Sequence, residues 1–210
     1  RVREVTVFTF WSNEEHNWGD IFTPFLFKER YGIDVAWERC ASNCDFLSTG
    51  SILDTVRDGY AGEICGSGFL RPPYAVRNFL DARVHLVRGG LTRERIAIRG
   101  PEPMYGDPGL LAYIFAPPAF LRRYDLGIVP HYLDKLHPQV TDATILKEGQ
   151  SNTAVKLIDI QSGIQSVINQ VICCKRIVAS ALHGLVVADS LGIPSAVVKL
   201  NDEVWHDGVK

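Results

Sequence analysis

The sequence predicts an α/β protein in which short buried strands alternate with helices. Residues 5–10 have the β-branched and aromatic composition of a strand, and Phe22, Phe25 and Leu26 share one face of a helix expected over residues 21–31. Residues 164–172 repeat apolar side chains at i, i+3, i+4, i+7 and i+8, the pattern of an amphipathic helix. Strands that end in glycine- and serine-rich loops before a helix are typical of parallel sheets.

The same pattern recurs along the whole chain. In the first half we expect strands over residues 34–37, 46–49, 64–65 and 84–87, with helices over residues 91–95 and 109–115. In the second half we expect strands over residues 127–129, 143–146, 155–160, 176–179 and 195–198, the last of them buried, and a second helix over residues 182–190.

A break in this series lies at residues 117–123, where two prolines and two arginines favour an exposed linker. It predicts two domains, residues 1–120 and residues 121–210. Each has the strand and helix order of a Rossmann-like lobe, with a cleft expected between them. Ligands of such sheets bind at the carboxyl ends of the strands, so the loops that follow the strands are the first place to look for chemistry.

Composition and charge exclude several classes of protein. The 210 residues include 22 Lys and Arg against 24 Asp and Glu, a formal net charge of −2, which excludes a strongly basic nucleic-acid-binding module. With 46% hydrophobic residues, the chain can bury a sizeable core. No run approaches the roughly 20 apolar residues of a membrane span, and the first residues lack a signal peptide's apolar stretch, so we expect a soluble protein.

The five cysteines favour a reduced, cytoplasmic setting, because their number is odd and their spacing irregular. Cys40 and Cys44 lie four residues apart, as metal ligands can. The second pair that a structural zinc site needs is missing, since Cys173 and Cys174 are adjacent. We therefore expect no bound metal.

Three loops of the first half carry candidate polar groups. Asp20 follows the first strand and precedes a helix, where it can cap the helix or act as a base. Ser67 and Gly68 offer backbone N–H groups to a phosphate or carboxylate, although a tight turn explains them equally well. Arg88 stands directly before two glycines and a helix start, so it is either an anion clamp or an ordinary surface arginine.

Two loops of the second half carry the remaining candidates. His131 and Asp134 follow the strand expected at residues 127–129, and a histidine there is as readily structural as catalytic. The segment Ser180–Gly184 lies between a strand and an apolar helix, with His183 at the helix start. A histidine in that place can exchange hydrogen bonds with an anionic ligand, the alternative being a packed residue at a capped helix start.

Six segments taken together resemble the polysaccharide pyruvyl transferase family, in order and in rough spacing over nearly the whole chain. They are residues 17–20, 50–53, 87–89, 106–111, 127–132 and 180–185, followed by Ala-Asp-Ser-Leu-Gly-Ile-Pro at residues 188–194. The chain departs from the family pattern at two positions. Ala181 stands where many relatives have arginine, and Gly90 stands where the family's Arg-Gly-Pro-Leu-Thr has proline.

The resemblance implies a two-lobed fold similar to the GT-B glycosyltransferases and an enzyme that uses phosphoenolpyruvate as its donor substrate, without a cofactor. The acceptor would be a sugar of an exopolysaccharide or cell-surface glycan, or a lipid-linked oligosaccharide precursor. The product would be a pyruvate ketal on that sugar. Such an enzyme would work in the cytoplasm, with peripheral association at the inner face of the membrane where the acceptor is anchored.

The resemblance also implies roles for individual residues. His183 would supply a proton or steady the departing phosphate, and Asp20 and His131 are candidates for the base that takes a proton from the sugar hydroxyl. The acceptor side would include Asn17, Trp18 and Tyr132, although aromatic rings more often pack in a core than stack on sugars. The residues expected to bind the donor are Arg88, Ser180, Leu182, His183, Gly184, Ser67 and Gly68.

Two other functions stay open at this stage, because a fold does not determine a function. One is a nucleotide-sugar glycosyltransferase of the GT-B type. The other is an inactive relative that binds the glycan or the donor without turning it over, which the short chain and Ala181 favour.

Overall fold

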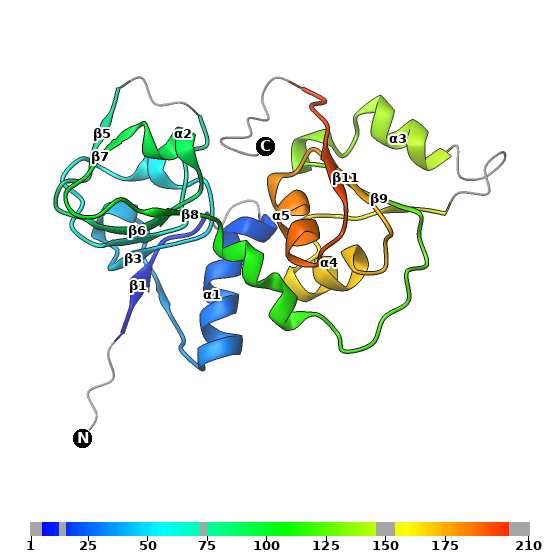
Figure 1. The fold of residues 1–210 in the computed structure, drawn as a ribbon, viewed down its shortest axis with the longest axis horizontal. Helices are drawn as coiled ribbons and strands as arrows, with labels where there is room; N and C mark the ends of the chain where they lie inside the picture. Colours follow the sequence, from blue (N-terminus) through cyan, green and yellow to red (C-terminus); the bar gives the residue numbers. More distant parts are fainter. Residues whose placement is uncertain (1–5, 13–15, 72–74, 146–153, 202–210) are drawn as a thin grey trace. The chain divides into compact units, whose positions relative to one another are not determined.

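A computed structural model describes residues 6–12, 16–71, 75–145 and 154–201 (Figure 1). The chain forms two compact units, which are described one at a time. The N-terminal unit comprises residues 19–108 with the first strand, and the C-terminal unit comprises residues 109–201 with residues 16–18. Both are mixed α/β structures with parallel sheets, consistent with the Rossmann-like lobes that the sequence predicts. The GT-B-like arrangement of the two lobes stays a prediction.

The N-terminal unit is built on a six-stranded parallel sheet with the strand order β2-β1-β3-β4-β6-β8. Its strands are β1 (Phe8–Thr9), β2 (Ala36–Trp37), β3 (Phe46–Leu47), β4 (Glu63–Cys65), β6 (Arg83–Val87) and β8 (Met104–Tyr105). A second, two-stranded parallel sheet pairs β5 (Arg77–Asn78) with β7 (Ile96–Ala97). The sequence predicts β1 to β4 and β6, but it misses β5, β7 and β8.

Short helices and loops connect these strands. The long helix is α1 (Trp18–Tyr31), which begins three residues before the expected start, and α2 (Gly90–Arg93) contributes a single turn. The remaining turns are the 3₁₀ helices η1 (Ala41–Asn43) and η2 (Leu53–Thr55). Gly50 and Ser51 lie in a loop that leads into η2, a 3₁₀ turn too short to present a helix N-terminus.

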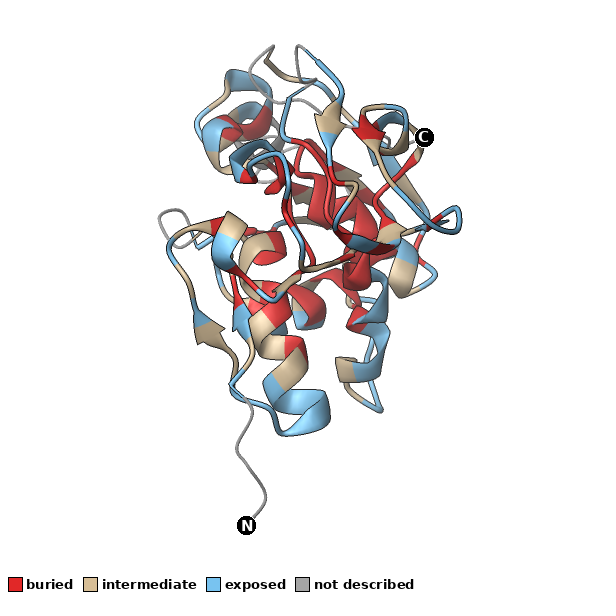
Figure 2. Cartoon of the chain, turned by 90° about the vertical axis from the view of Figure 1, so that its left-hand side faces the viewer, coloured by how far each residue is buried: buried red, intermediate tan, exposed pale blue. Residues whose placement is uncertain are grey.

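A compact apolar core holds the N-terminal unit together. Leu47, Ile64 and Val87, one from each of three neighbouring strands, are fully buried, and Phe69 and Phe79 pack into the same cluster. Buried residues lie in the strands and in the loops between them (Figure 2). In β6, Val84 and Val87 are buried whereas Arg83 and His85 are exposed, so the sheet is not shielded from water along the whole of this strand.

The C-terminal unit is built on a four-stranded parallel sheet with the order β10-β9-β11-β12. Its strands are β9 (Leu126–Val129), β10 (Val155–Leu157), β11 (Ile177–Ala179) and β12 (Ser195–Val197). Its helices are α3 (Pro138–Ile145), α4 (Ile164–Val171) and α5 (Leu182–Ser190), with 3₁₀ helices η3 (Pro108–Phe115) and η4 (Tyr132–Asp134). No helix among the described residues is long and apolar enough to cross a membrane.

Two expectations for this unit are wrong. Residues 143–145 belong to the helix α3 and not to a strand, because Pro138 opens a helix whose early residues are polar; residue 146 lies outside the described residues. The last strand, β12, is an edge strand with exposed Ala196 and Val197, so it is not the buried strand that its apolar composition suggests. Residues 117–123 carry neither helix nor strand.

Close packing of helices on the sheet depends on two glycines. A Cβ added to Gly184 in α5 would lie 2.8 Å from Val129 Cβ, so its absence lets α5 approach β9. A Cβ added to Gly127 in β9 would lie 2.6 Å from Ile177 Cδ1 and 2.8 Å from Cys174 Sγ. Both distances are too short for real carbon contacts, so the neighbours would have to move.

We expect Gly127→Ala to lower the free energy of unfolding by about 1–3 kcal/mol, because the added methyl group overpacks the core against Ile177 and Cys174. Chemical denaturation monitored by circular dichroism measures the change. Gly90→Ala is the control, since a Cβ there meets nothing within 4 Å, and it should change stability by less than about 1 kcal/mol. Equal stabilities of the Gly127→Ala variant and the wild type would contradict the packing described above.

Candidate functional site

Each of the two larger parallel sheets has a switch point, where the strands that come next along the chain are added on the opposite side of the first strand. In the N-terminal unit β1 lies between β2 and β3, and in the C-terminal unit β9 lies between β10 and β11. At such a switch point the loops after the two strands diverge and leave a crevice at the carboxyl edge, where ligands of open α/β sheets bind. For each candidate residue we therefore ask whether it lies at one of these two switch points.

In the N-terminal unit, α1 and the loop after β3 meet at the switch point. Asp20 lies in the first turn of α1, and its Oδ1 would be 3.0 Å from a Cβ added to Gly50. Gly50 has a φ of 116°, a conformation that L side chains rarely adopt. The Thr49 N–H donates to Thr23 Oγ1 at 3.1 Å, which joins the loop to the same helix. The carboxylate of Asp20 thus lies close to the backbone of Gly50, and the lack of a side chain at Gly50 leaves room for it.

Arg88, which follows β6, reaches back along the carboxyl edge of the N-terminal sheet. Its side chain donates from Nη1 to Ser51 Oγ at 2.6 Å and from Nη2 to the Phe69 carbonyl at 2.7 Å. Only 7% of the residue is exposed, and a Cβ added to Gly68 would lie 2.7 Å from the guanidinium carbon. Arg88 is therefore not a surface arginine: it joins the loops after β3, β4 and β6.

Ser67 and Gly68 lie in the loop that Arg88 covers. Ser67 is fully buried, its hydroxyl donates to the Ser48 carbonyl, and its carbonyl accepts the Arg88 N–H at 3.2 Å. The Gly68 N–H donates to the Gly50 carbonyl at 3.1 Å. These contacts bring Ser67, Gly68 and Arg88 together, and they use the Gly68 N–H within the chain.

In the C-terminal unit, the ends of β9 and β11 are joined directly at the switch point. The His131 N–H donates to Ser180 Oγ at 2.9 Å, and the Ser180 N–H donates to the Val129 carbonyl at 3.2 Å. Ser180 is 1% exposed, whereas His131 is half-buried. The ring of Tyr132 lies 4.2 Å from that of His131, centroid to centroid. The structure thus brings together three candidate residues from two separate segments.

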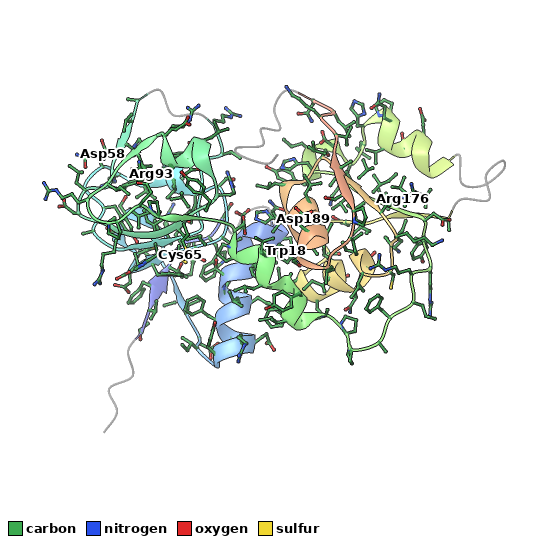
Figure 3. The ribbon with its side chains drawn as sticks, in the orientation of Figure 1. Trp18, Asp58, Cys65, Arg93, Arg176 and Asp189 are labelled. Carbon is green, nitrogen blue, oxygen red and sulfur yellow. The ribbon has the colours of Figure 1, made fainter. Side chains whose placement is uncertain are left out.

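His183 lies in the first turn of α5, beside the same switch point. It is 5% exposed, and its ring centroid is 5.7 Å from that of Trp18, with an angle of 34° between the planes. Trp18 is fully buried and its indole Nε1 donates to the Ile164 carbonyl at 3.3 Å (Figure 3). Trp18 therefore packs against His183 and does not present an open face on which a sugar could stack.

The other residues of the Ser180–Gly184 motif have packing roles. Leu182 is buried, and Gly184 is the residue that lets α5 lie against Val129. Asn17, expected on the acceptor side, is half-buried just before α1.

A buried carboxylate also belongs to this edge. Asp134 in η4 is fully buried and accepts a hydrogen bond from Asn201 Nδ2, which ties the end of β9 to the segment after β12. The strand-end position of Asp134 already draws attention to it in the sequence. Nothing local in the sequence marks Asn201, because the two residues are 67 positions apart.

The described residues hold no group of three or more His, Cys, Asp or Glu side chains placed to bind a metal ion, and all five cysteines are free thiols. Burial raises the pKa of the Cys174 thiol to about 11 and that of Cys44 to about 12, with nearby acidic groups adding to the effect at Cys44. Both thiols are therefore protonated at neutral pH and are not suited to act as metal ligands or nucleophiles.

The parallel sheets and the helices that connect their strands define a mixed α/β protein, with polar side chains at the switch points of the two larger sheets. Residues 117–202 match the family model described as polysaccharide pyruvyl transferase, which confirms the expected resemblance over this part of the chain. The matched region contains His131, Ser180 and His183. At the level of the family, the match supports a polysaccharide pyruvyl transferase and indicates a transferase.

The chain is also similar to an uncharacterized protein of Acanthamoeba polyphaga mimivirus. The two are 29% identical over 194 residues, which cover 88% of this chain and 64% of the length of the viral protein. The chain thus spans less than two thirds of that relative. No solved structure matches the chain significantly.

The contacts of Arg88 predict a measurable loss of stability. Arg88→Ala removes two hydrogen bonds from a buried guanidinium, so we expect the free energy of unfolding to fall by about 2–3 kcal/mol. A double-mutant cycle with Ser51→Ala should give a coupling energy of about 0.5–3 kcal/mol.

Lys28→Ala is the control, because Lys28 forms an exposed ion pair with Asp34 and its loss should cost less than about 1 kcal/mol. A coupling energy of zero between Arg88 and Ser51 would show that their contact is not formed in solution.

Proposed function

We propose that the protein transfers pyruvate from phosphoenolpyruvate onto a sugar of an exopolysaccharide or cell-surface glycan, forming a ketal. The observation that carries this proposal is the family match over residues 117–202, because it contains the segment Ser180–Gly184 that follows β11. That segment is joined to His131 by a hydrogen bond at the switch point of its sheet, a place suited to ligand binding.

The reaction needs a proton donor, a base and a site for two anionic groups. A proton adds to the methylene carbon of phosphoenolpyruvate, and the C2 atom becomes open to attack by a sugar hydroxyl, which loses its proton to a base. Phosphate then leaves as the C–O bond breaks, and a second hydroxyl of the sugar attacks C2 and loses its proton. The products are the cyclic ketal and phosphate.

His183 is the proposed proton donor, or the group that steadies the departing phosphate. Its ring lies 5.7 Å from that of the buried Trp18, centroid to centroid and tilted by 34°, and this contact limits the movement of the ring before a ligand binds. Ser180, Leu182 and Gly184 contribute to donor binding by shaping the turn into α5. With Ala181 as the residue before α5, no side chain caps the helix there.

In the N-terminal unit, Arg88 is the proposed cation for a carboxylate or phosphate, with Ser67 and Gly68 beside it. Its guanidinium is already held in place by Ser51 and Phe69, which removes the cost of ordering it. Asp20 is the proposed base, because its carboxylate lies at the switch point over Gly50.

The acceptor side is proposed to include Asn17 and Tyr132, with Trp18 acting through its contact with His183. The acceptor itself would be a glycan sugar or a lipid-linked oligosaccharide. The setting we propose is the cytoplasm, with peripheral contact to the inner face of the membrane. We expect no nucleic-acid partner and no cofactor.

The donor can be identified by thermal unfolding with added ligands. Phosphoenolpyruvate at about 100 times its Kd should stabilise the fold by roughly 2.7 kcal/mol, seen as a rise in Tm. A panel of nucleotide sugars is tested in parallel, with inorganic sulfate as the control for a general anion effect. A rise with a nucleotide sugar and none with phosphoenolpyruvate would replace our proposal by a glycosyltransferase.

His183→Ala should lower the turnover of phosphoenolpyruvate by roughly 10²- to 10⁴-fold, the range for loss of a general acid or base. Phosphate release measures the rate, and the Tm of the variant shows whether the loss of stacking on Trp18 has unfolded it. His85→Ala is the control, because His85 is an exposed histidine paired with Glu63 and should keep wild-type turnover. Full activity of a folded His183→Ala variant would exclude the assigned role.

A further inference from the structure

We propose that the amino edge of the C-terminal sheet binds the surface of an anionic phospholipid bilayer. This edge lies at the starts of strands β9, β10 and β11, opposite to the carboxyl edge where His131 and Ser180 meet. The inference deepens the membrane contact proposed above and rests on that proposal for its setting, although the binding itself requires no reaction. The edge carries a basic cluster, which comprises Arg122, Arg123, Lys156, Lys175 and Arg176. Beside it lies an apolar pair, Phe120 and Leu121.

Backbone hydrogen bonds at the starts of the strands bring the basic cluster together. The Lys175 N–H donates to the Tyr124 carbonyl at 2.8 Å, and the Tyr124 N–H donates to the Cys173 carbonyl at 3.1 Å. The two arginines that directly precede Tyr124 therefore lie near the residues that lead into β11. From β10, on the other side of β9, the Lys156 ammonium lies 5.9 Å from the centroid of the Tyr124 ring. Three segments that are distant in sequence thus contribute cations to one edge.

Two carboxylates near this edge leave the basic cluster with a surplus of positive charge. Asp125 Oδ1 pairs with Lys175 Nζ at 2.8 Å, and Asp125 Oδ2 accepts the Ala154 N–H at 2.9 Å. Asp189, near the end of α5, accepts from Ser195 Oγ at 3.1 Å. Within the part of the chain that the structure describes, no carboxylate forms an ion pair with the three arginines of the cluster. The edge therefore presents cations that attract an anionic surface.

The apolar pair distinguishes a bilayer from other polyanions. Leu121 is 68% exposed and Phe120 is 44% exposed, directly before the two arginines. Arg122 Cζ lies 6.0 Å from the centroid of the Phe120 ring, so the cation and the ring occupy the same part of the surface. At a membrane interface, apolar side chains enter the headgroup region while neighbouring cations contact lipid phosphates. A nucleic acid or a sulfated glycan offers no apolar layer for Leu121 to enter.

A cavity with apolar lining adjoins the basic cluster. Its volume is about 440 Å³, and Arg176 and Asp125 line it together with Leu126, Val178 and Ala196 from three strands of the sheet. Cavities of this size hold small ligands. Hydrocarbon suits such a lining, because the removal of apolar surface from water is favourable. The cavity therefore favours a lipid, which has both an anionic headgroup and apolar chains, over a purely polar anion.

Co-sedimentation with vesicles measures the binding directly. We expect the wild type to bind vesicles of phosphatidylcholine and phosphatidylserine about 100-fold more tightly than vesicles of phosphatidylcholine alone. The three arginines account for this ratio, because each cation near an anionic surface strengthens binding by about fivefold. Binding should weaken as the salt concentration rises, since dissolved ions screen the attraction. Failure of the wild type to bind the mixed vesicles would overturn the proposal.

Variants at exposed positions locate the surface without disturbing the fold. The double variant Arg122→Ala, Arg123→Ala should bind the mixed vesicles about 25-fold more weakly. Leu121→Ser should weaken binding by about 10- to 150-fold, the transfer of one leucine side chain. The matched controls should bind as the wild type does, because their side chains are exposed elsewhere. They are the double variant Arg57→Ala, Arg99→Ala and the single variant Leu136→Ser.

The remaining outcomes separate this surface from other occupants and from the proposed function. Equal vesicle binding by the wild type and both cluster variants would overturn the assignment of this edge. A wild type that binds heparin or duplex DNA but not the mixed vesicles has a polyanion site, and one that forms a dimer dissociated by Leu121→Ser covers the edge with a second copy. Either result contradicts our proposal. If the wild type and variants bind vesicles as expected but phosphoenolpyruvate does not raise the Tm, the surface stands and the proposed function fails.

Discussion

The parallel pairing of β9 with β11 is the constraint on which the candidate site of the C-terminal unit depends. It sets Val129 opposite Ala179, so the residues that follow the two strands emerge side by side at the carboxyl edge. His131 and Ser180 are 49 positions apart in sequence and share a hydrogen bond for this reason alone. The order of the strands leaves a crevice beside these residues. The chain leaves β9 for β10 on one side, whereas β11 lies on the other side of β9.

In the N-terminal unit, the loops at the carboxyl edge of the sheet contain less regular secondary structure. In the loops after β3 and β4, the described residues form no helix of more than one turn, so helix packing does not position those residues. Hydrogen bonds do so instead: Arg88 joins the two loops, and Thr23 in α1 holds the end of β3. A buried charge is costly unless its N–H groups are satisfied. The hydrogen bonds from Nη1 and Nη2 of Arg88 therefore fix the geometry of these loops, and this role is structural.

The sequence predicts those parts of the fold that local patterns encode. Strands β6, β9 and β11 are recognisable as short apolar runs, and α4 as an amphipathic helix, because their side chains repeat with the period of the element. The edge position of β12 and the helical state of α3 escape such patterns. Whether Ala196 is covered depends on a further neighbouring strand, and the described residues contain none beside β12. The residues of α3, Pro-Gln-Val-Thr-Asp-Ala-Thr-Ile, lack the regular apolar spacing that marks α4.

The candidate site, too, is predicted from the sequence only in part. The motif Ser180–Gly184 is visible in sequence, but the sequence does not show that Gly184 serves packing while Ser180 holds His131. Trp18 is another instance, since an aromatic residue in a strand-end loop suggests sugar stacking until the ring is found buried against His183. Each of these roles depends on a partner far along the chain, which residue type and spacing do not identify.

The two capping histidines of the C-terminal unit show how the sheet decides the surroundings of a residue where local contacts do not. His131 and His137 each accept, through Nδ1, from the N–H two residues ahead at 3.3 Å. His131 follows the end of β9 at a switch point, and its backbone N–H is bonded to Ser180 at the end of the neighbouring strand β11. His137 precedes the helix α3 and follows no strand directly. The same local contact therefore lies at the carboxyl edge of the sheet in one case and at a helix start in the other, because the strand order decides which loop reaches that edge.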